Sequence, residues 1–419
     1  MYQAEASRVL LKPKTWASPA ARLSVPRNVV LLGLVSMLTD ISAEMVATVL
    51  PLYLVFSLGV TPLVLGAIDG LYRGAAAIVQ VASGLASDRW RRPKEVATIG
   101  YGLSAICKVG LVAIGSSVGA IGALVATDRL GKGMRTAPRD ALISLSSTKA
   151  GLATSFGVHR AMDSAGAMLG PLIAFGVLLV APARFDAVFV ISTLFALLGL
   201  AVLVLAVQGR PERAPRSANA PSLRLVAQGV LRERRFQLLL LAAGGLALAS
   251  VSDALIYVAL QRRTEFEPTV FPLLFVVTAV VFMVLAIPVG RLADRLGRVP
   301  VLIVGHALLL PVYGLLLTSA GTTAVVLSLV ALGAYYAATE GVTTALAGAI
   351  LPDSLQASGI GVLITVISLG QFASSLAFGA LWFALGLQSA VLIFAVALVV
   401  ALVVSAPLLM RLREEPVVE

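Results

Sequence analysis

Acidic residues inside long apolar segments are the side chains of this sequence most suited to chemistry. Asp40 and Glu44 stand four positions apart in a largely apolar stretch, so in a helix both lie on one face. An ionisable group among apolar residues is costly to bury, which makes it a candidate site residue. A carboxyl group there can bind and release a proton if each side of the apolar layer reaches it in turn. We expect Asp40 and Glu44 to perform this exchange.

Other polar residues occur in similar surroundings, most of them in the first half of the chain. Asp69 and Arg73 are also four residues apart, and each could simply neutralise the other. Asp163 could likewise be held in a structural pair by Arg160 or His159. The remaining candidates for proton coupling or for lining a binding cavity are Lys108, Arg129, Asp163, Asp253, Tyr335, Tyr336, Glu340 and Gln371.

The elements that must position these residues are apolar helices. Hydrophobic residues make up 59% of the 419 positions and charged residues only 13%, too few to cover a soluble protein. Apolar stretches of about 20 residues recur along the chain, and each can span a bilayer as a helix. A membrane β-barrel would instead show alternating stretches of about ten residues. The expected spans are 28–57, 62–86, 96–116, 119–143, 151–180, 184–207, 236–261, 269–290, 299–318, 322–350, 358–383 and 386–410.

The loops between these helices indicate their orientation. Basic or polar loops alternate with nearly neutral ones, as expected when the basic loops face the cytoplasm. Both termini then lie on the cytoplasmic side of the bacterial inner membrane. Because the net charge of +11 resides in these loops, we expect a lipid bilayer and no nucleic acid as partner. The basic or polar loops are 87–95, 144–150, 208–235 and 291–298, and the nearly neutral ones are 115–118, 262–268, 319–321 and 384–388.

The predicted organisation is two six-helix bundles joined by a polar linker. The linker is rich in Arg, Pro and Ser and is interpreted as a basic tether, with a regulatory role and a short interfacial helix near 222–233 as alternatives. The basic N-terminal segment has no apolar core, so we expect no cleaved signal peptide. A single cysteine, Cys107, excludes an internal disulfide. The predicted boundaries are 1–27, 28–207, 208–235, 236–410 and 411–419.

The two bundles repeat a short charged motif. The first copy runs Gly84-Leu-Ala-Ser-Asp88-Arg89-Trp-Arg-Arg92, and the second runs Gly290-Arg-Leu-Ala-Asp294-Arg295-Leu-Gly-Arg298, 206 residues further along the chain. Such repeats are typical of transporters, whose substrate sites lie between the repeats near the middle of the bilayer. We therefore expect a site there.

With these motifs the chain resembles the major facilitator superfamily, over residues 28–410. The second copy matches that family's Gly-x-x-x-Asp-Arg-x-Gly-Arg loop fully, whereas the first has Arg91 in place of glycine. Arg129 and Gly133 match an Arg-x-x-x-Gly pattern in the fourth helix. A third pattern, in the fifth helix, matches Gly157, Gly166, Gly170 and Pro171, although Ala174 replaces its last glycine. The resemblance implies an all-α membrane fold of twelve helices in two pseudo-symmetric bundles.

The resemblance also implies roles for these residues. Asp88 would contact the start of the eleventh helix, near Ser358 and Gly359, and act as a latch between conformations. The alternative is that the motif residues only anchor loops by their charge. Arg129 would assist proton transfer, or else pair with Asp128 or a first-helix acid. The expected latch residues are Gly84, Asp88, Arg89, Arg92, Gly290, Asp294, Arg295 and Arg298, with Arg135 and Arg139 forming a cytoplasmic gate by pairing with Asp140 or Asp88.

The fifth-helix pattern is associated in this family with exporters and antiporters. The text around residues 39–44 and 131–140 resembles a bacterial, exporter-like branch. We expect a monomeric exporter of a small molecule, driven by the proton gradient and without another cofactor. Alternatives are an anionic or siderophore-like cargo held by Arg73, Lys108 and Arg129, a metal ion, or a membrane sensor. No nucleotide-binding loop, histidine cluster or nucleophile pattern indicates an enzyme.

Overall fold

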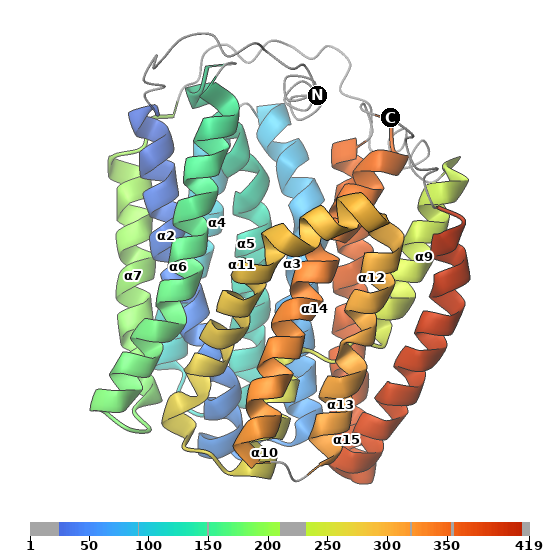
Figure 1. Cartoon of the computed structure of the whole chain (residues 1–419). Helices are drawn as coiled ribbons and strands as arrows, with labels where there is room; N and C mark the ends of the chain where they lie inside the picture. Colours follow the sequence, from blue (N-terminus) through green and yellow to red (C-terminus); the bar gives the residue numbers. More distant parts are fainter. Residues whose placement is uncertain are drawn as a thin grey trace. The chain divides into compact units, whose positions relative to one another are not determined.

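The computed structural model describes residues 25–90, 92–148, 151–209, 232–318, 321–352 and 356–412 (Figure 1), and for residues 77, 78, 80–90, 153, 357 and 358 it describes the backbone alone. Every regular element in these residues is a helix. Nine helical segments of this described part are long and apolar enough to cross a membrane. The 29-residue helices α3 (Pro62–Trp90) and α5 (Val118–Ser146) are not among the nine. They carry several of the candidate site residues. The all-helical membrane fold is confirmed, and the number of twelve helices stays a prediction.

Contacts between residues divide the chain into two compact units. The first unit consists of residues 1–49 and 75–220. Within it, α4 packs against both α5 and α7 (Figure 1). Fully buried side chains such as Leu32, Tyr101 and Leu142 form one of its core clusters. Its helices are most of α2 (Arg27–Leu52), the end of α3, α4 (Pro93–Ala113), α5, α6 (Leu152–Val180) and α7 (Phe185–Leu205).

The second unit consists of residues 50–74 and 221–419. The segment 50–74 includes a π-helical turn, η1 (Tyr53–Ser57), and the first half of α3. Contacts therefore group this segment with the later helices, although the predicted bundles divide the chain at the linker. The other elements are α9 (Arg234–Leu248), α10 (Asp253–Thr264), η3 (Pro268–Val270), α11 (Phe271–Leu296), α12 (Arg298–Ala307), α13 (Leu309–Leu317), α14 (Gly321–Ile350) and α15 (Gln356–Met410).

Most predicted spans agree with helices to within a few residues. One span differs because its helix is interrupted. The predicted span 236–261 corresponds to one apolar span, Arg234–Thr264, but its helix is broken, because α9 ends at Leu248 and α10 begins at Asp253. Ser252 caps the new helix, since its Oγ accepts a hydrogen bond from the backbone N–H of Leu255 at 3.3 Å. Four turn or extended residues, 249–252, thus interrupt the helix.

Two glycines reverse the chain in the second unit. The predicted loop 291–298 is helical up to Leu296, and only Gly297, with φ of 94°, turns the chain into α12. Gly386, with φ of 82°, interrupts α15 in the same way. The rings of Phe378 and Phe394 lie 5.2 Å apart, although 16 residues of continuous helix would separate them by about 24 Å. Residues 356–410 therefore form a helical hairpin, as the two predicted spans require.

Candidate functional site

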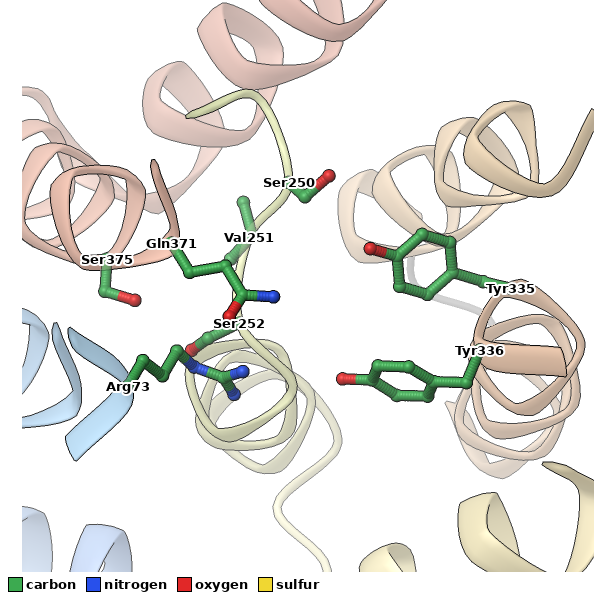
Figure 2. Close-up of a pocket in the computed structure, with 8 residues that line it drawn as sticks. All are labelled: Arg73, Ser250, Val251, Ser252, Tyr335, Tyr336, Gln371 and Ser375. Atoms are coloured by element: carbon green, nitrogen blue, oxygen red, sulfur yellow. The ribbon is translucent and has the colours of Figure 1, made fainter. Parts of the chain in front are cut away.

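A polar pocket surrounds the break between α9 and α10 in the second unit (Figure 2). Its walls come from the break itself, from α3, from α14 and from α15. The empty space within it is about 240 Å³, including the part that opens to solvent. The lining residues are Arg73, Ser250, Val251, Ser252, Tyr335, Tyr336, Gln371 and Ser375.

Arg73 is held between two carboxylates at one side of this pocket. Its Nε lies 3.3 Å from Asp69 Oδ2, and its Nη2 is paired with Asp253 Oδ1. Ser375 Oγ donates a hydrogen bond of 2.6 Å to Asp69 Oδ2. The predicted neutralisation of Arg73 by Asp69 is present, and Asp253 is a further partner from a distant part of the sequence. One guanidinium between two carboxylates leaves the cluster with an excess negative charge.

The helix break exposes backbone groups that a polar side chain holds in place. Tyr313 donates its hydroxyl hydrogen to Ala249 O at 3.0 Å, and the same oxygen accepts from Val251 N–H at 2.8 Å. Ser374 Oγ donates to Ser250 O at 2.7 Å. Because buried backbone groups must be paired, these bonds allow the chain to leave the helix at this depth. The N-terminus of α10 consequently begins at the pocket.

Close packing of α3 on α15 brings Asp69 and Arg73 to the pocket. A Cβ at Gly66 would lie 2.3 Å from Ser375 O, and one at Gly70 would lie 2.9 Å from Phe372 O. Gly74 is similarly close to the Phe372 side chain. Glycines at every fourth position let two helix backbones approach. This Gly66-x3-Gly70-x3-Gly74 stripe was missed in the sequence interpretation, although its spacing is visible there.

Aromatic and amide groups complete the pocket wall. The hydroxyl of Tyr336 and the amide of Gln371 point towards the space beside Arg73 (Figure 2). The rings of Tyr335 and Tyr336 lie 5.0 Å apart, so both predicted tyrosines of α14 reach the pocket. Glu340, one turn further along α14, has an exposed side chain, and no ion pair of this carboxylate occurs among the described residues. The pocket therefore unites Arg73, Tyr335, Tyr336 and Gln371, with Asp69 and Asp253 behind Arg73.

A separate buried ion cluster lies between α4 and α5 in the first unit. Asp128 Oδ2 lies 2.8 Å from Arg129 Nη2 and 3.3 Å from Lys108 Nζ. All three residues are at most 6% exposed. Asp128 thus binds both cations, which is the structural alternative stated for Arg129.

The first-helix acid Asp40 lies in another cluster of the first unit. Asp40 Oδ1 is 3.8 Å from Arg135 Nη2, and Asp163 Oδ1 is 3.8 Å from Arg139 Nη1. Asp163 Oδ2 also lies 3.9 Å from Arg160 Nη1. Arg135 therefore pairs with Asp40 and, among the described side chains, not with Asp140, whereas the predicted pairing with Asp88 lies outside them. The cluster connects α2, α5 and α6.

Neighbouring polar side chains close one side of this cluster. Arg139 pairs with Asp140 at 2.9 Å, as predicted, and also donates to Ser36 Oγ at 3.3 Å. His159 Nε2 and Ser36 Oγ form a hydrogen bond of 2.9 Å, so His159 contacts Ser36 rather than Asp163. The guanidinium of Arg135 lies over the Tyr101 ring, 4.5 Å from its centroid.

The fifth-helix glycines pack against α2. A Cβ at Gly166 would lie 2.5 Å from Met37 O, and one at Gly170 would lie 2.8 Å from both Ile41 O and Glu44 Cβ. Pro171 follows within the helix and is buried. Gly157 differs, because it is exposed and a Cβ there would meet nothing within 4 Å. Close packing thus applies to Gly166 and Gly170 but not to Gly157.

The predicted latch is only partly covered by the structure. The side chains of Asp88 and Arg89 lie outside the described residues, as does that of Ser358, and the contacts of Gly84 are not described either. Arg92 precedes α4 and is exposed. A Cβ at Gly290 would meet none of the described atoms within 4 Å, so no described helix packs closely against this glycine. Asp294 and Arg295 are exposed near the end of α11, and Arg298 begins α12. The latch therefore stays a prediction.

An all-helical membrane fold with a polar pocket at a broken helix defines a membrane transporter. The family model of the Major Facilitator Superfamily matches residues 32–266 and 243–419. The chain belongs to this superfamily of secondary transporters, and it is an integral membrane protein.

Relatives in sequence agree with this assignment. An uncharacterized MFS-type transporter of Methanocaldococcus jannaschii is 30% identical over 370 residues, which cover 85% of this chain and 88% of that protein. An uncharacterized protein of Mycobacterium tuberculosis is 36% identical over 156 residues, 37% of this chain and 38% of the other.

Solved structures share the fold at low sequence identity. The nucleoside transporter NupG has a TM-score of 0.74 at 16% identity, over 91% of this chain and 99% of that one. A bacterial homolog of the lysosomal transporter Spinster, in an inward-facing and unoccupied conformation, has a TM-score of 0.69 at 14% identity, over 93% and 98% of the two chains. A POT family transporter has a TM-score of 0.72 at 15% identity, over 90% of this chain and 95% of that one.

Proposed function

We propose that this protein exports a small polar molecule, neutral or cationic, across the cytoplasmic membrane in exchange for protons. The observation that carries the proposal is the pocket at the α9–α10 break, where Arg73 is held by Asp69 and Asp253. A pocket with convergent hydroxyl, amide and aromatic groups suits a ligand rich in hydrogen-bonding groups. Alternating exposure of the bound molecule to the two sides of the membrane would then give transport.

The charges of the pocket favour a neutral or cationic cargo over an anionic one. To bind an anion, the pocket would need a cation that is not already neutralised by carboxylates. The two assigned contacts of the Arg73 guanidinium, from Nε to Asp69 and from Nη2 to Asp253, are both with carboxylates. Lys108 and Arg129, the other two residues of the anion alternative, both bind Asp128 and lie in the first unit. A cationic group could instead compete with Arg73 for Asp253.

Proton exchange and export rest on two further features. Carboxyl groups occur within the membrane-spanning helices of both units, and such groups are typical of proton pathways. The fifth-helix pattern resembles that of exporters and antiporters, and its Gly166 and Gly170 support a close contact with the acid-bearing helix α2. Because the proton gradient of a bacterial membrane is directed inwards, proton exchange amounts to export.

Transport by the purified protein in proteoliposomes tests the proposal. The probes are radiolabelled uridine, a neutral dipeptide, tetraethylammonium and citrate, each supplied outside vesicles with an imposed pH gradient. Nucleoside and peptide probes are included because structural neighbours carry those names. An acidic lumen should drive accumulation of uridine, the dipeptide or tetraethylammonium, and a protonophore should abolish it. Accumulation driven by an acidic bath, or transport of citrate alone, would contradict the proposal.

Variants of the pocket residues test whether the measured transport depends on this pocket. Arg73→Ala should lower the initial rate by about tenfold or more, since losing a buried charged contact costs at least about 1.4 kcal/mol. Arg184→Ala is the matched control, because Arg184 pairs only with the adjacent exposed Asp186 in the assigned contacts. Equal rates for Arg73→Ala and the wild type would exclude the pocket as the binding site.

A further inference from the structure

The ion pair between Arg73 and Asp253 joins two helices of the second unit. Arg73 stands on α3 and Asp253 is the first residue of α10, so the pair connects α3 to the point where the helix break ends. The side chains are 17% and 21% exposed, so neither is sealed from its surroundings. Arg73 lines the pocket, whereas Asp253 is not among the lining residues. A ligand in the pocket therefore meets Arg73 first and reaches Asp253 only by displacing it.

Asp69 gives Arg73 a second partner that does not depend on α10. The two residues are four positions apart on α3, and Arg73 Nε lies 3.3 Å from Asp69 Oδ2. Asp69 is buried, and the same oxygen accepts a hydrogen bond of 2.6 Å from Ser375 Oγ. This acid is therefore held in place, while the arginine side chain has several rotatable bonds. Arg73 can leave Asp253 and still keep a carboxylate partner on its own helix.

Asp253 requires a cation whenever Arg73 leaves it. Its Oδ1 accepts a hydrogen bond of 3.0 Å from Ala254 N–H, and an anionic side chain in the first turn of a helix is stabilised by the helix dipole. A carboxylate without a cation is costly at membrane depth. A ligand with its own positive charge can replace Arg73 there, whereas a neutral ligand would leave the acid uncompensated. Binding at Asp253 thus selects for a positive charge.

The other walls of the pocket suit a flat organic cation. Arg73 is the one charged residue among the eight described residues that line it. The rings of Tyr335 and Tyr336 lie 5.0 Å apart at the pocket wall, and aromatic faces attract cations (Figure 2). Glu340, one turn after Tyr336, adds a further acid on the same face of α14. The surroundings of Asp253 therefore favour a cation over a neutral molecule of the same shape.

We propose that the cargo is an organic cation with an amidinium or guanidinium group, and that this group replaces Arg73 at Asp253. Such a group presents two parallel N–H donors to a carboxylate, as an arginine side chain can. Arg73 is then a tethered competitor that occupies the position of the cation until the cargo arrives. The inference rests on the proposed transport and narrows its cargo to a cation of this geometry.

Exchange of cations at Asp253 also changes a contact between helices. Bound cargo removes the direct ion pair of α3 with α10, and the return of Arg73 restores this pair and expels the cargo. Two mutually exclusive arrangements of this kind can couple binding to a conformational change. Arg73 thus weakens binding and promotes release, so its removal should tighten binding and slow turnover. The lower transport rate expected for Arg73→Ala agrees with this role.

Isothermal titration calorimetry of the full chain in lipid nanodiscs tests the exchange without a proton gradient. The probes are benzamidine, which carries an amidinium group, and benzamide, its neutral isostere. The wild type should bind benzamidine at least about tenfold more tightly than benzamide, since only benzamidine can replace Arg73. Asp253→Asn should abolish this preference. Asp186→Asn, the same change at an exposed acid that also pairs with an arginine, should retain it.

A double variant separates competition by Arg73 from a direct contact of Arg73 with the cargo. Arg73→Ala combined with Asp69→Asn removes one positive and one negative charge, so the cluster keeps its net charge and Asp253 stays in place. Because the competitor is gone, benzamidine should bind about tenfold more tightly than it binds the wild type. Weaker binding would show that Arg73 itself holds the cargo. Thermal unfolding in the same nanodiscs checks that the variant is folded, and the comparison of the two probes on the wild type needs no variant.

The outcomes distinguish this inference from the proposed function. Equal affinities of the wild type for benzamidine and benzamide, or no binding of benzamidine, would overturn the cation exchange. If benzamidine binds as expected while no probe responds to the pH gradient, the recognition of cations stands and the proposed proton-driven export fails. If transport of uridine or the dipeptide is proton-driven and excess benzamidine does not inhibit it, export stands and the recognition of cations at Asp253 is overturned.

Discussion

Asp128 in α5 binds two cations. Substitution of this acid should therefore affect stability differently from substitution of either cation. Lys108, Asp128 and Arg129 are all buried, and the acid lies between the two cations. Removing the single carboxylate leaves both cations buried without compensation. Removing one of the two cations still leaves a compensated ion pair. The three residues are therefore not equally replaceable.

We predict that Asp128→Asn destabilises the protein far more than Lys108→Met. The first change leaves two buried cations without their carboxylate and should cost about 3 kcal/mol or more. The second change leaves the 2.8 Å Arg129–Asp128 pair and places an apolar side chain of similar length in the Lys108 position. Thermal unfolding in detergent measures both, and the double variant should recover part of the loss. Equal effects of the two single changes would show that Asp128 does not bind both cations.

At the scale of residues, short-range pairs could be predicted and long-range pairs could not. The spacing of Asp69 and Arg73 fixes a common helix face, and their contact is present at 3.3 Å. The contact of Arg73 with Asp253 joins residues 180 positions apart, so it depends on helix rotations that the sequence does not fix. The contact of Asp40 with Arg135, 95 positions apart, has the same origin. Long-range pairs of this kind determine the candidate sites.

The helix α6 contains two glycines of one motif in opposite surroundings. A Cβ at Gly166 would lie 2.5 Å from Met37 O and 2.9 Å from Met37 Cα, which are backbone atoms that cannot move aside separately. A Cβ at Gly157 would meet nothing within 4 Å. Both residues have ordinary helical dihedral angles, so backbone conformation does not favour glycine at either.

We predict opposite outcomes for the same substitution at these two positions. Gly166→Ala should separate α6 from α2 and cost about 1–3 kcal/mol through overpacking. Gly157→Ala should be neutral or slightly stabilising, because alanine is the better helix former. The midpoint of thermal unfolding in detergent compares them directly. A fall in that midpoint for Gly157→Ala as large as for Gly166→Ala would mean that the motif acts through something other than this contact.

At the scale of elements, apolar length predicted where helices lie but not where they break. The run from 236 to 261 is long enough to span a bilayer, and it lies within one apolar span of the structure, but apolar length gives no sign of the break inside it. Ser250, Ser252 and Asp253 form a helix-start signal inside the run, which could have indicated the break. The Tyr313 hydroxyl that holds the broken backbone comes from another helix. Its role could be read only from the fold.

The orientation of the whole molecule in the membrane follows from a charge pattern and has a direct consequence for accessibility. Helix α5 has 29 residues, so it is about 43 Å long and can connect the two sides of a bilayer. Ser116 precedes it in a neutral loop, and Thr148 follows it in a loop with a lysine. Both side chains are exposed in the structure. The positive-inside rule predicts that Thr148 lies on the cytoplasmic side and Ser116 outside.

Single-cysteine variants test this orientation in whole cells. The chain has one cysteine, Cys107, and it is buried, so Cys107→Ala provides a background without thiols. In this background Ser116→Cys should react with a membrane-impermeant maleimide added to intact cells. Thr148→Cys should react only after the cells are permeabilised. The reverse pattern would contradict the predicted topology. It would leave the proposed direction of transport unchanged, because the inward proton gradient drives the cargo of an antiporter outwards in either orientation of the chain. Flux in right-side-out vesicles of the same variants then decides the direction independently of the labelling.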